Sequence, residues 1–276
     1  MKNIEKAQEE IGKNIRFIQS LLGLSDKSFY SGLNSSEPTL KKILNSDSQV
    51  YIDLYIQVAF LFGMRLEELT NRTLRLPHNF REILLSYHSF IDSEALLALS
   101  QRPKTNYAIE RLLKSESLND FMKAEKIQQE IENLIGHTYS VSTLSTAIQN
   151  FKDQIISRPA ADNSNHKEYK LKTPFTEDHL TTYTPSYIRL AQYLSPNPNR
   201  HISFDILFKM FEILIQIKDA PKLGEDILRS FKRTPFNVTN VEIHFIPLQE
   251  ANLISVEKRA GNDYLYHITD KGMDVL

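Results

Sequence analysis

Apolar residues recur three and four positions apart along most of the chain, which is the spacing of one face of an α-helix. The stretches with this spacing include 11–22, 80–90, 121–135 and 204–217. Alternation of apolar and polar residues, which is typical of a half-buried strand, is confined to two places, near 155–172 and 254–268. The pattern therefore predicts a mainly α protein with two small β-hairpins.

Residues that start and stop helices divide the N-terminal part of this pattern. Ser25 and Ser36 stand where caps are needed for a second helix over 26–32 and for a third helix that runs to Leu44. Two further amphipathic helices are expected around 50–62 and 66–69. This part of the chain is therefore expected to form a five-helix domain built around a helix-turn-helix.

Four segments carry a resemblance to a known family: IGKNIRFIQ at the start, LGLSDKSF at the second helix, SSEPTLKKILN at the third and VAFLFGMRLEEL at the end. Together they resemble the lambda-repressor/Cro-like (XRE) family of DNA-binding domains over residues 11–70. In that family the third helix enters the major groove, and its first residues contact base edges. The resemblance therefore implies DNA contacts by Ser36, Glu37, Thr39, Lys41 and Lys42, with Asn45 at the DNA backbone.

Three positions depart from the family pattern. Asp26 opens the second helix, where the family usually carries Gln, and its carboxylate would repel a phosphate. Leu44 replaces the acidic residue that usually ends the third helix, and Asn34 replaces the turn Gly, although Asn tolerates a left-handed backbone. The alternative is therefore a domain that kept this fold and no longer binds DNA.

A second stretch has the order of a winged helix-turn-helix: helix, turn, Ser/Thr-rich helix, strand, polar loop and strand. Gly136 closes its first helix, and Ser140 is placed to cap the next one. That helix is expected to expose small donors and acceptors, and the loop and last strand are expected to add positive charge. The candidate DNA contacts here are Tyr139, Ser142, Thr143, Thr146, Lys167 and Lys170. A solvated loop beside a packing helix is the alternative.

The C-terminal stretch repeats this order. A strongly apolar helix over 204–217 is expected to be either a buried central helix or an oligomer interface, and it motivates the prediction of a homodimer. A hairpin is expected from strands at 254–259 and 264–269. Pro247 kinks or breaks a helix, so the segment before the hairpin is expected to split after Ile246. The alternative to DNA reading by this unit is a winged helix used for packing or dimerisation.

These patterns predict three domains: a helix-turn-helix domain at 1–76, a winged-helix-like domain at 77–172 and a second winged-helix-like domain at 173–276. The formal net charge is −1 and the pI is about 6.7. Overall charge therefore gives no support to DNA binding, and any basic surface must be local.

The composition and the motif search exclude several kinds of chemistry. The chain has no cysteine, which removes disulfides, thiolate metal sites and a cysteine nucleophile. It shows no Gly-rich phosphate loop, no nucleophile elbow and no metal-ligand spacing of its histidines. Glu5, Glu9 and Glu10 stand where a signal peptide needs an apolar core, and no apolar run approaches the roughly 18 to 20 residues of a membrane span. We therefore expect a cytoplasmic protein without cofactor or metal that is not an enzyme.

The expected function is that of a sequence-specific transcriptional regulator whose partner is double-stranded DNA. The alternative is a helical, winged-helix scaffold that binds protein partners or dimerises without binding DNA. No small-molecule effector follows from the sequence.

Overall fold

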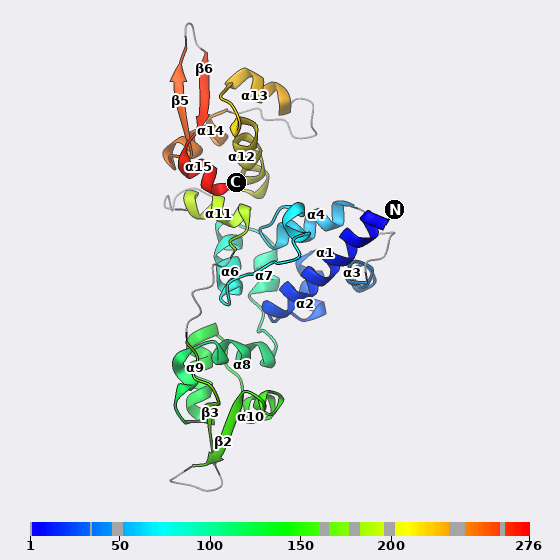
Figure 1. Cartoon of the computed structure of the whole chain (residues 1–276), viewed down its shortest axis with the longest axis vertical. Coiled ribbons are helices and arrows are strands. Elements are labelled where there is room, and N and C mark those ends of the chain that lie inside the picture. Colours follow the sequence, from blue (N-terminus) through cyan, green and yellow to red (C-terminus); the bar gives the residue numbers. More distant parts are fainter. Residues whose placement is uncertain are drawn as a thin grey trace. The chain divides into compact units, whose positions relative to one another are not determined.

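The structure is a computed structural model that describes residues 2–33, 35–45, 52–160, 166–176, 183–195, 202–231, 241–259 and 263–276. Within these residues the chain is mainly helical, and its strands form two small three-stranded antiparallel sheets (Figure 1). The predicted fold class, mainly α with small β-hairpins, is confirmed.

Packing divides the chain into two compact units. The first unit consists of Met1–Leu54, Leu69–Glu82 and Leu97–Tyr183, and the second consists of Tyr55–Glu68, Ile83–Leu96 and Thr184–Leu276. The predicted boundaries after residues 76 and 172 do not coincide with this division, and they stay predictions.

The N-terminal helices begin and end close to the predicted positions. They are α1 (Lys2–Leu21), α2 (Asp26–Gly32), α3 (Glu37–Leu44), α4 (Ile52–Leu61) and α5 (Leu66–Leu69). Ser25 caps α2 as predicted, because its Oγ accepts a hydrogen bond from the backbone N–H of Ser28 at 3.0 Å. In the first unit α3 packs against both α1 and α2. Asn34, the predicted turn residue, lies outside the described residues.

A winged helix lies within the Leu97–Tyr183 segment of the first unit. Helices α6 (Phe80–Phe90) and α7 (Ala95–Leu99) come before it in the chain. Its elements are α8 (Thr105–Leu113), β1 (Met122–Lys123), α9 (Ala124–Ile135), α10 (Val141–Ile148), β2 (Ile155–Pro159) and β3 (Lys167–Leu171). The sheet has the order β1-β3-β2, in which Ile155 pairs with Leu171 and Arg158 with Glu168. Gly136 ends α9 in a left-handed conformation, and Ser140 caps α10, both as predicted.

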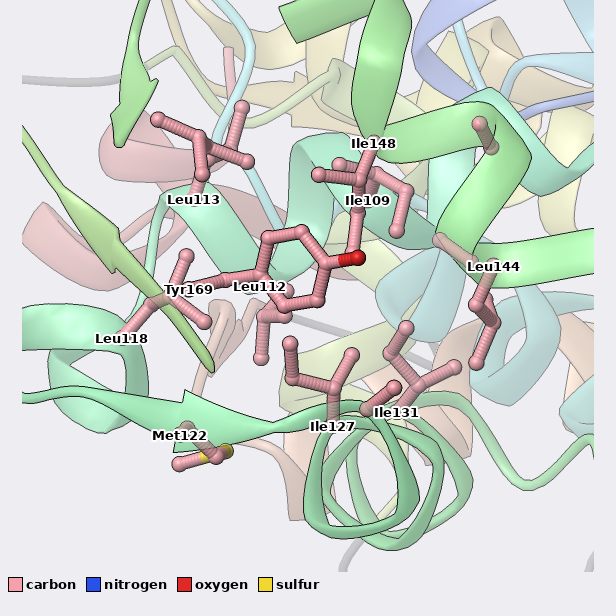
Figure 2. Packing of buried hydrophobic residues seen from close by; sticks show 14 of the residues in the cluster. Ile109, Leu112, Leu113, Leu118, Met122, Ile127, Ile131, Leu144, Ile148 and Tyr169 are labelled. Carbon is pink, nitrogen blue, oxygen red and sulfur yellow. The ribbon is translucent and has the colours of Figure 1, made fainter. Parts of the chain in front are cut away.

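The core of this winged helix is built where its three helices meet the inner face of the sheet. Ile109 and Leu112 from α8, Ile127 and Ile131 from α9, and Leu144 and Ile148 from α10 are all buried. Figure 2 shows Tyr169 reaching from β3 into the middle of this cluster. The burial of these side chains orients α10 and the hairpin, which are the elements that carry the candidate contacts.

The second unit contains another winged helix with the same order of elements. Its elements are α11 (Ser186–Leu194), α12 (Phe204–Ile217), β4 (Lys222–Leu223), α13 (Gly224–Phe231), α14 (Val241–Glu250), β5 (Ile254–Lys258), β6 (Tyr264–Ile268) and α15 (Asp270–Val275). The sheet order β4-β6-β5 corresponds to β1-β3-β2 of the first unit. From α12 to β6, the chain therefore repeats the architecture that runs from α8 to β3.

The predicted break before Pro247 is wrong. Helix α14 runs without interruption from Val241 to Glu250, with Pro247 in its interior. Proline removes one backbone donor, but Phe245 and Leu248 on either side are buried at 1% and 0% exposure. The packing of these two side chains outweighs the local preference of proline to end the helix.

Helix α12 is a buried central helix rather than an exposed apolar face. Leu207, Met210, Phe211, Leu214 and Ile217 are all buried within the single chain. The apolar surface that suggested an oligomer interface is therefore already covered, and the homodimer stays a prediction.

One argument for a homodimer remains, which is the two-fold symmetry that helix-turn-helix regulators share with palindromic DNA sites. Light scattering of the full chain at micromolar concentration is expected to give twice the chain mass of 32.0 kDa. A mass equal to that of one chain over the whole concentration range would contradict the prediction.

Candidate nucleic-acid interface

Helix α3 presents most of its predicted contact residues to solvent. Ser36, Glu37, Lys41, Lys42 and Asn45 are exposed, and Thr39 is half-buried. Lys41 Nζ lies 2.8 Å from Glu37 Oε1 one helical turn earlier, and this hydrogen-bonded pair raises the pKa of Lys41. Lys42 makes no ion pair with another residue that the structure describes. The net positive charge that α3 offers to a phosphate is therefore smaller than its two lysines indicate.

Helix α1 contacts both α2 and the end of α3 through polar side chains. Arg16 Nη2 donates to Leu44 O at 2.7 Å and to Asn45 Oδ1 at 3.0 Å. A guanidinium at this position stabilises the C-terminal end of α3, where the helix dipole is negative. Gln19 Nε2 donates to Asp26 Oδ1 at 2.7 Å, so the acidic residue that departs from the family pattern is held by α1. Sequence reasoning missed Arg16 and Gln19, because their partners are far away in sequence or on another helix.

Helix α10 is the last α-helix before the hairpin of the first winged helix, and it carries no charged side chain. Ser142, Thr143 and Thr146 are exposed as predicted. The Oγ of Ser140 accepts a hydrogen bond from the backbone N–H of Thr143 at 3.2 Å, and Thr146 Oγ1 donates to Ser142 O at 2.9 Å. The hydroxyls of Ser140 and Thr146 are therefore oriented by bonds within the helix, and each keeps hydrogen-bonding capacity for a base edge or a phosphate.

The prediction that Tyr139 faces outward is wrong. Its side chain is 4% exposed, and its hydroxyl donates to Pro103 O at 2.6 Å. Burial raises the pKa of Tyr139 to about 12, so the phenol stays protonated and keeps this bond. Tyr139 is therefore a packing residue that ties the start of α10 to the segment before α8.

The hairpin places its two candidate lysines on opposite faces of the sheet. Lys167 lies on the same face of β3 as the buried Tyr169 and Leu171, because side chains alternate along a strand. Lys170 lies on the other face, with its Nζ 5.9 Å from the centre of the Phe121 ring. Arg158 stacks over the same ring at 3.8 Å and pairs with Glu168 at 3.0 Å. Of the two candidate lysines, Lys167 is therefore the one that faces α10.

A groove of about 490 Å³ separates α10 from the hairpin. The polar side chains that line it are Glu125, Ser145, Thr146, Gln149, His166 and Lys167. His166 Nδ1 lies 3.9 Å from Glu125 Oε1, too far for a hydrogen bond. The described residues from Lys152 to Lys172 carry five basic side chains (Lys152, Arg158, Lys167, Lys170 and Lys172) and two acidic ones (Asp153 and Glu168). The positive excess therefore lies along residues 152–172 as a whole, whereas the groove itself is lined by one cation, Lys167, and one anion, Glu125.

The corresponding helix of the second winged helix has a different surface. Ile243 and Ile246 of α14 are 44% and 39% exposed, and His244 between them is buried. In the neighbouring hairpin, Arg259 Nε lies 3.1 Å from Glu257 Oε1. The repeat therefore conserves the order of the elements but not the polar surface of α10.

No family model, no curated protein and no solved structure matches this chain. In the part of the chain that the structure describes, no cluster of His, Asp or Glu side chains could hold a metal ion. None of the described helices is long and apolar enough to cross a membrane.

Proposed function

We propose that this protein binds double-stranded DNA and acts as a sequence-specific transcriptional regulator. The observation that carries the proposal is the first winged helix, in which the hydroxyls of Ser145 and Thr146 from α10 and the cation of Lys167 from the hairpin line one groove. Hydroxyl groups read base edges and bind phosphates, and lysines neutralise phosphates. The helix-turn-helix offers a second contact surface on α3, where Lys42 and the N-terminal Ser36 are exposed.

The alternative proposal is a scaffold that binds protein partners without DNA. The exposed Ile243 and Ile246 of α14 favour this role for the second winged helix, because apolar side chains on the exposed face of a helix suit a protein surface better than DNA. The two roles are compatible within one chain, with DNA bound by the first unit and a protein partner by the second.

Duplex affinity as a function of salt tests the DNA proposal. The full chain is expected to bind a short mixed-sequence duplex at low salt, with an affinity that falls linearly on a log–log plot. Lys167→Ala is expected to weaken binding and to flatten this slope by about 0.9, the value for one lost phosphate contact. Thr146→Ala is expected to leave the slope unchanged and to relax the sequence preference, because Thr carries no charge. Fluorescence anisotropy of a labelled duplex measures both.

Two matched lysine variants complete this experiment. Lys42→Ala reports on α3 in the same way that Lys167→Ala reports on the wing, and Lys218→Ala removes an exposed lysine of the second unit as the control. If Lys42→Ala alone flattens the slope, the helix-turn-helix and not the winged helix contacts DNA. The absence of duplex binding by the parent at low salt would reject the DNA proposal in favour of the scaffold.

A further inference from the structure

A cleft of about 290 Å³ lies in the first unit, between the α1–α2 corner and helix α8. Its charged and polar walls include Arg16, Ser20, Asp26, Lys104, Asn106 and Glu110. Arg16 and Ser20 are one turn apart on α1, and Asn106 and Glu110 are one turn apart on α8, so each helix turns a single polar stripe toward the cleft.

The corner that forms this cleft is held in place from both sides. Gly23 has a φ of +62°, and a side chain there would collide with Tyr107 and Pro103. The backbone N–H of Lys104 donates to Gly23 O at 2.9 Å, and Ser28 Oγ donates to Gln101 Oε1 at 2.7 Å. The cleft is therefore a preformed space between two fixed walls, as ligand sites usually are.

The charges in the cleft are balanced but not paired with one another. It is lined by two cations, Arg16 and Lys104, and two anions, Asp26 and Glu110. Among the residues that the structure describes, no ion pair involves any of these four side chains. Asp26 accepts a hydrogen bond from the neutral Gln19, and Arg16 donates to a carbonyl and an amide oxygen. Two charges of each sign around one cleft suit a ligand that itself carries both signs.

The size of the cleft limits the ligand. A cavity of roughly 150 Å³ holds a benzene molecule, and pockets for larger ligands start at roughly 300 Å³. At about 290 Å³ the cleft suits a molecule of amino-acid size rather than a nucleotide.

We propose that this cleft binds a small zwitterion, of the size and chemistry of a free amino acid, and that the ligand acts on both candidate DNA-contacting helices. Arg16 in its wall also holds the C-terminal end of α3 through Leu44 and Asn45. Asn106 in the opposite wall accepts a hydrogen bond from Asn150 Nδ2 at 3.2 Å, just beyond the end of α10. A carboxylate that recruits the Arg16 guanidinium competes with the α3 carbonyl for it, and a group that binds Asn106 acts in the same way on the end of α10.

Thermal unfolding of the full chain with each standard free amino acid at millimolar concentration tests the site without DNA, so the result does not depend on the proposed function. At least one amino acid is expected to raise Tm by roughly 5 to 10 °C when its concentration is about a hundred times its Kd. Its N-acetyl form and its amide, which each lack one charge, are expected to give a much smaller shift. If no amino acid shifts Tm, or if the blocked forms shift it equally, the proposal is overturned.

Charge-neutralising variants locate the ligand. Lys104→Gln and Glu110→Gln are expected to remove most of the ligand-induced shift, while the backbone N–H of residue 104 keeps its bond to Gly23. Lys114→Gln and Glu116→Gln neutralise exposed charges of the same kind outside the cleft, and they are expected to keep the full shift. A shift that survives in both cleft variants places the ligand elsewhere and rejects this site.

The regulatory half of the proposal rests on the proposed function and has its own readout. Once a ligand is identified, a saturating concentration of it is expected to change the affinity of the parent protein for duplex DNA. The same concentration is expected to leave the DNA affinity of the Glu110→Gln variant unchanged. A ligand that shifts Tm but leaves the DNA affinity of the parent unchanged would reject the regulatory role. If the parent binds no DNA at all, the proposed function fails while the thermal result for the cleft stands.

Discussion

Arg81→Met is expected to lower the free energy of unfolding by about 3 to 5 kcal/mol, because it removes a buried cation that three backbone carbonyls share. The Arg81 side chain is 3% exposed. Its guanidinium donates to Leu22 O, to Leu99 O and, at 2.6 Å, to Gln101 O. Leu22 follows the last residue of α1 and Leu99 ends α7, so the charge also faces the negative ends of two helices.

Methionine fills a similar volume but leaves these carbonyls without a donor. Urea unfolding of the parent and the variant measures the loss. Arg72→Met, at an exposed position without a described partner, is the matched control and is expected to change stability by less than about 0.5 kcal/mol. Arg81→Lys is expected to lie between the two, because an ammonium group cannot span all three carbonyls. A loss for Arg81→Met as small as that of the control would contradict the role given to this side chain.

Acidification from pH 7 to pH 5 is expected to destabilise the protein by about 2 kcal/mol through His88 alone. The His88 side chain is fully buried, and burial lowers its pKa from 6.5 to about 4. Its Nε2 lies 2.8 Å from Leu61 O, to which the neutral ring can donate, while Nδ1 has no hydrogen-bond partner among the described parts of the chain. A second proton would therefore be placed on a buried nitrogen without an acceptor.

The direction of this effect follows from proton binding. Between pH 6.5 and about 4, the unfolded chain binds a proton at His88 that the folded chain does not bind, so stability falls as the pH falls. His88→Gln can keep a donor to Leu61 O but cannot titrate. Its free energy of unfolding is expected to lose about 2 kcal/mol less than that of the parent over the same pH range. If the free energy of unfolding falls equally with pH in the two proteins, His88 is not the titrating group.

The candidate site could be predicted from sequence only in part. Exposed hydroxyls on α10 were found because helical spacing separates the buried Leu144 and Ile148 from Ser142, Thr143 and Thr146. Tyr139 was misplaced because it precedes the helix, where no periodicity applies, and its partner Pro103 is distant in sequence. The opposite directions of Lys167 and Lys170 follow from strand alternation once the buried face of β3 is known.

Local sequence by itself determined most helix boundaries, the caps at Ser25 and Ser140, the end of α9 at Gly136 and the two hairpins. The helix ends and caps depend on interactions between residues a few positions apart, and the hairpins show in the sequence as two alternating strands joined by one polar loop. Tertiary structure alone decided whether α14 continues through Pro247, because the burial of Phe245 and Leu248 outweighs the local effect of proline. It also decided the anchoring role of Arg81 and the existence of the charged cleft, since their partners come from segments distant in sequence. Packing energy between distant segments is large compared with local propensity, and only the folded chain shows which segments meet.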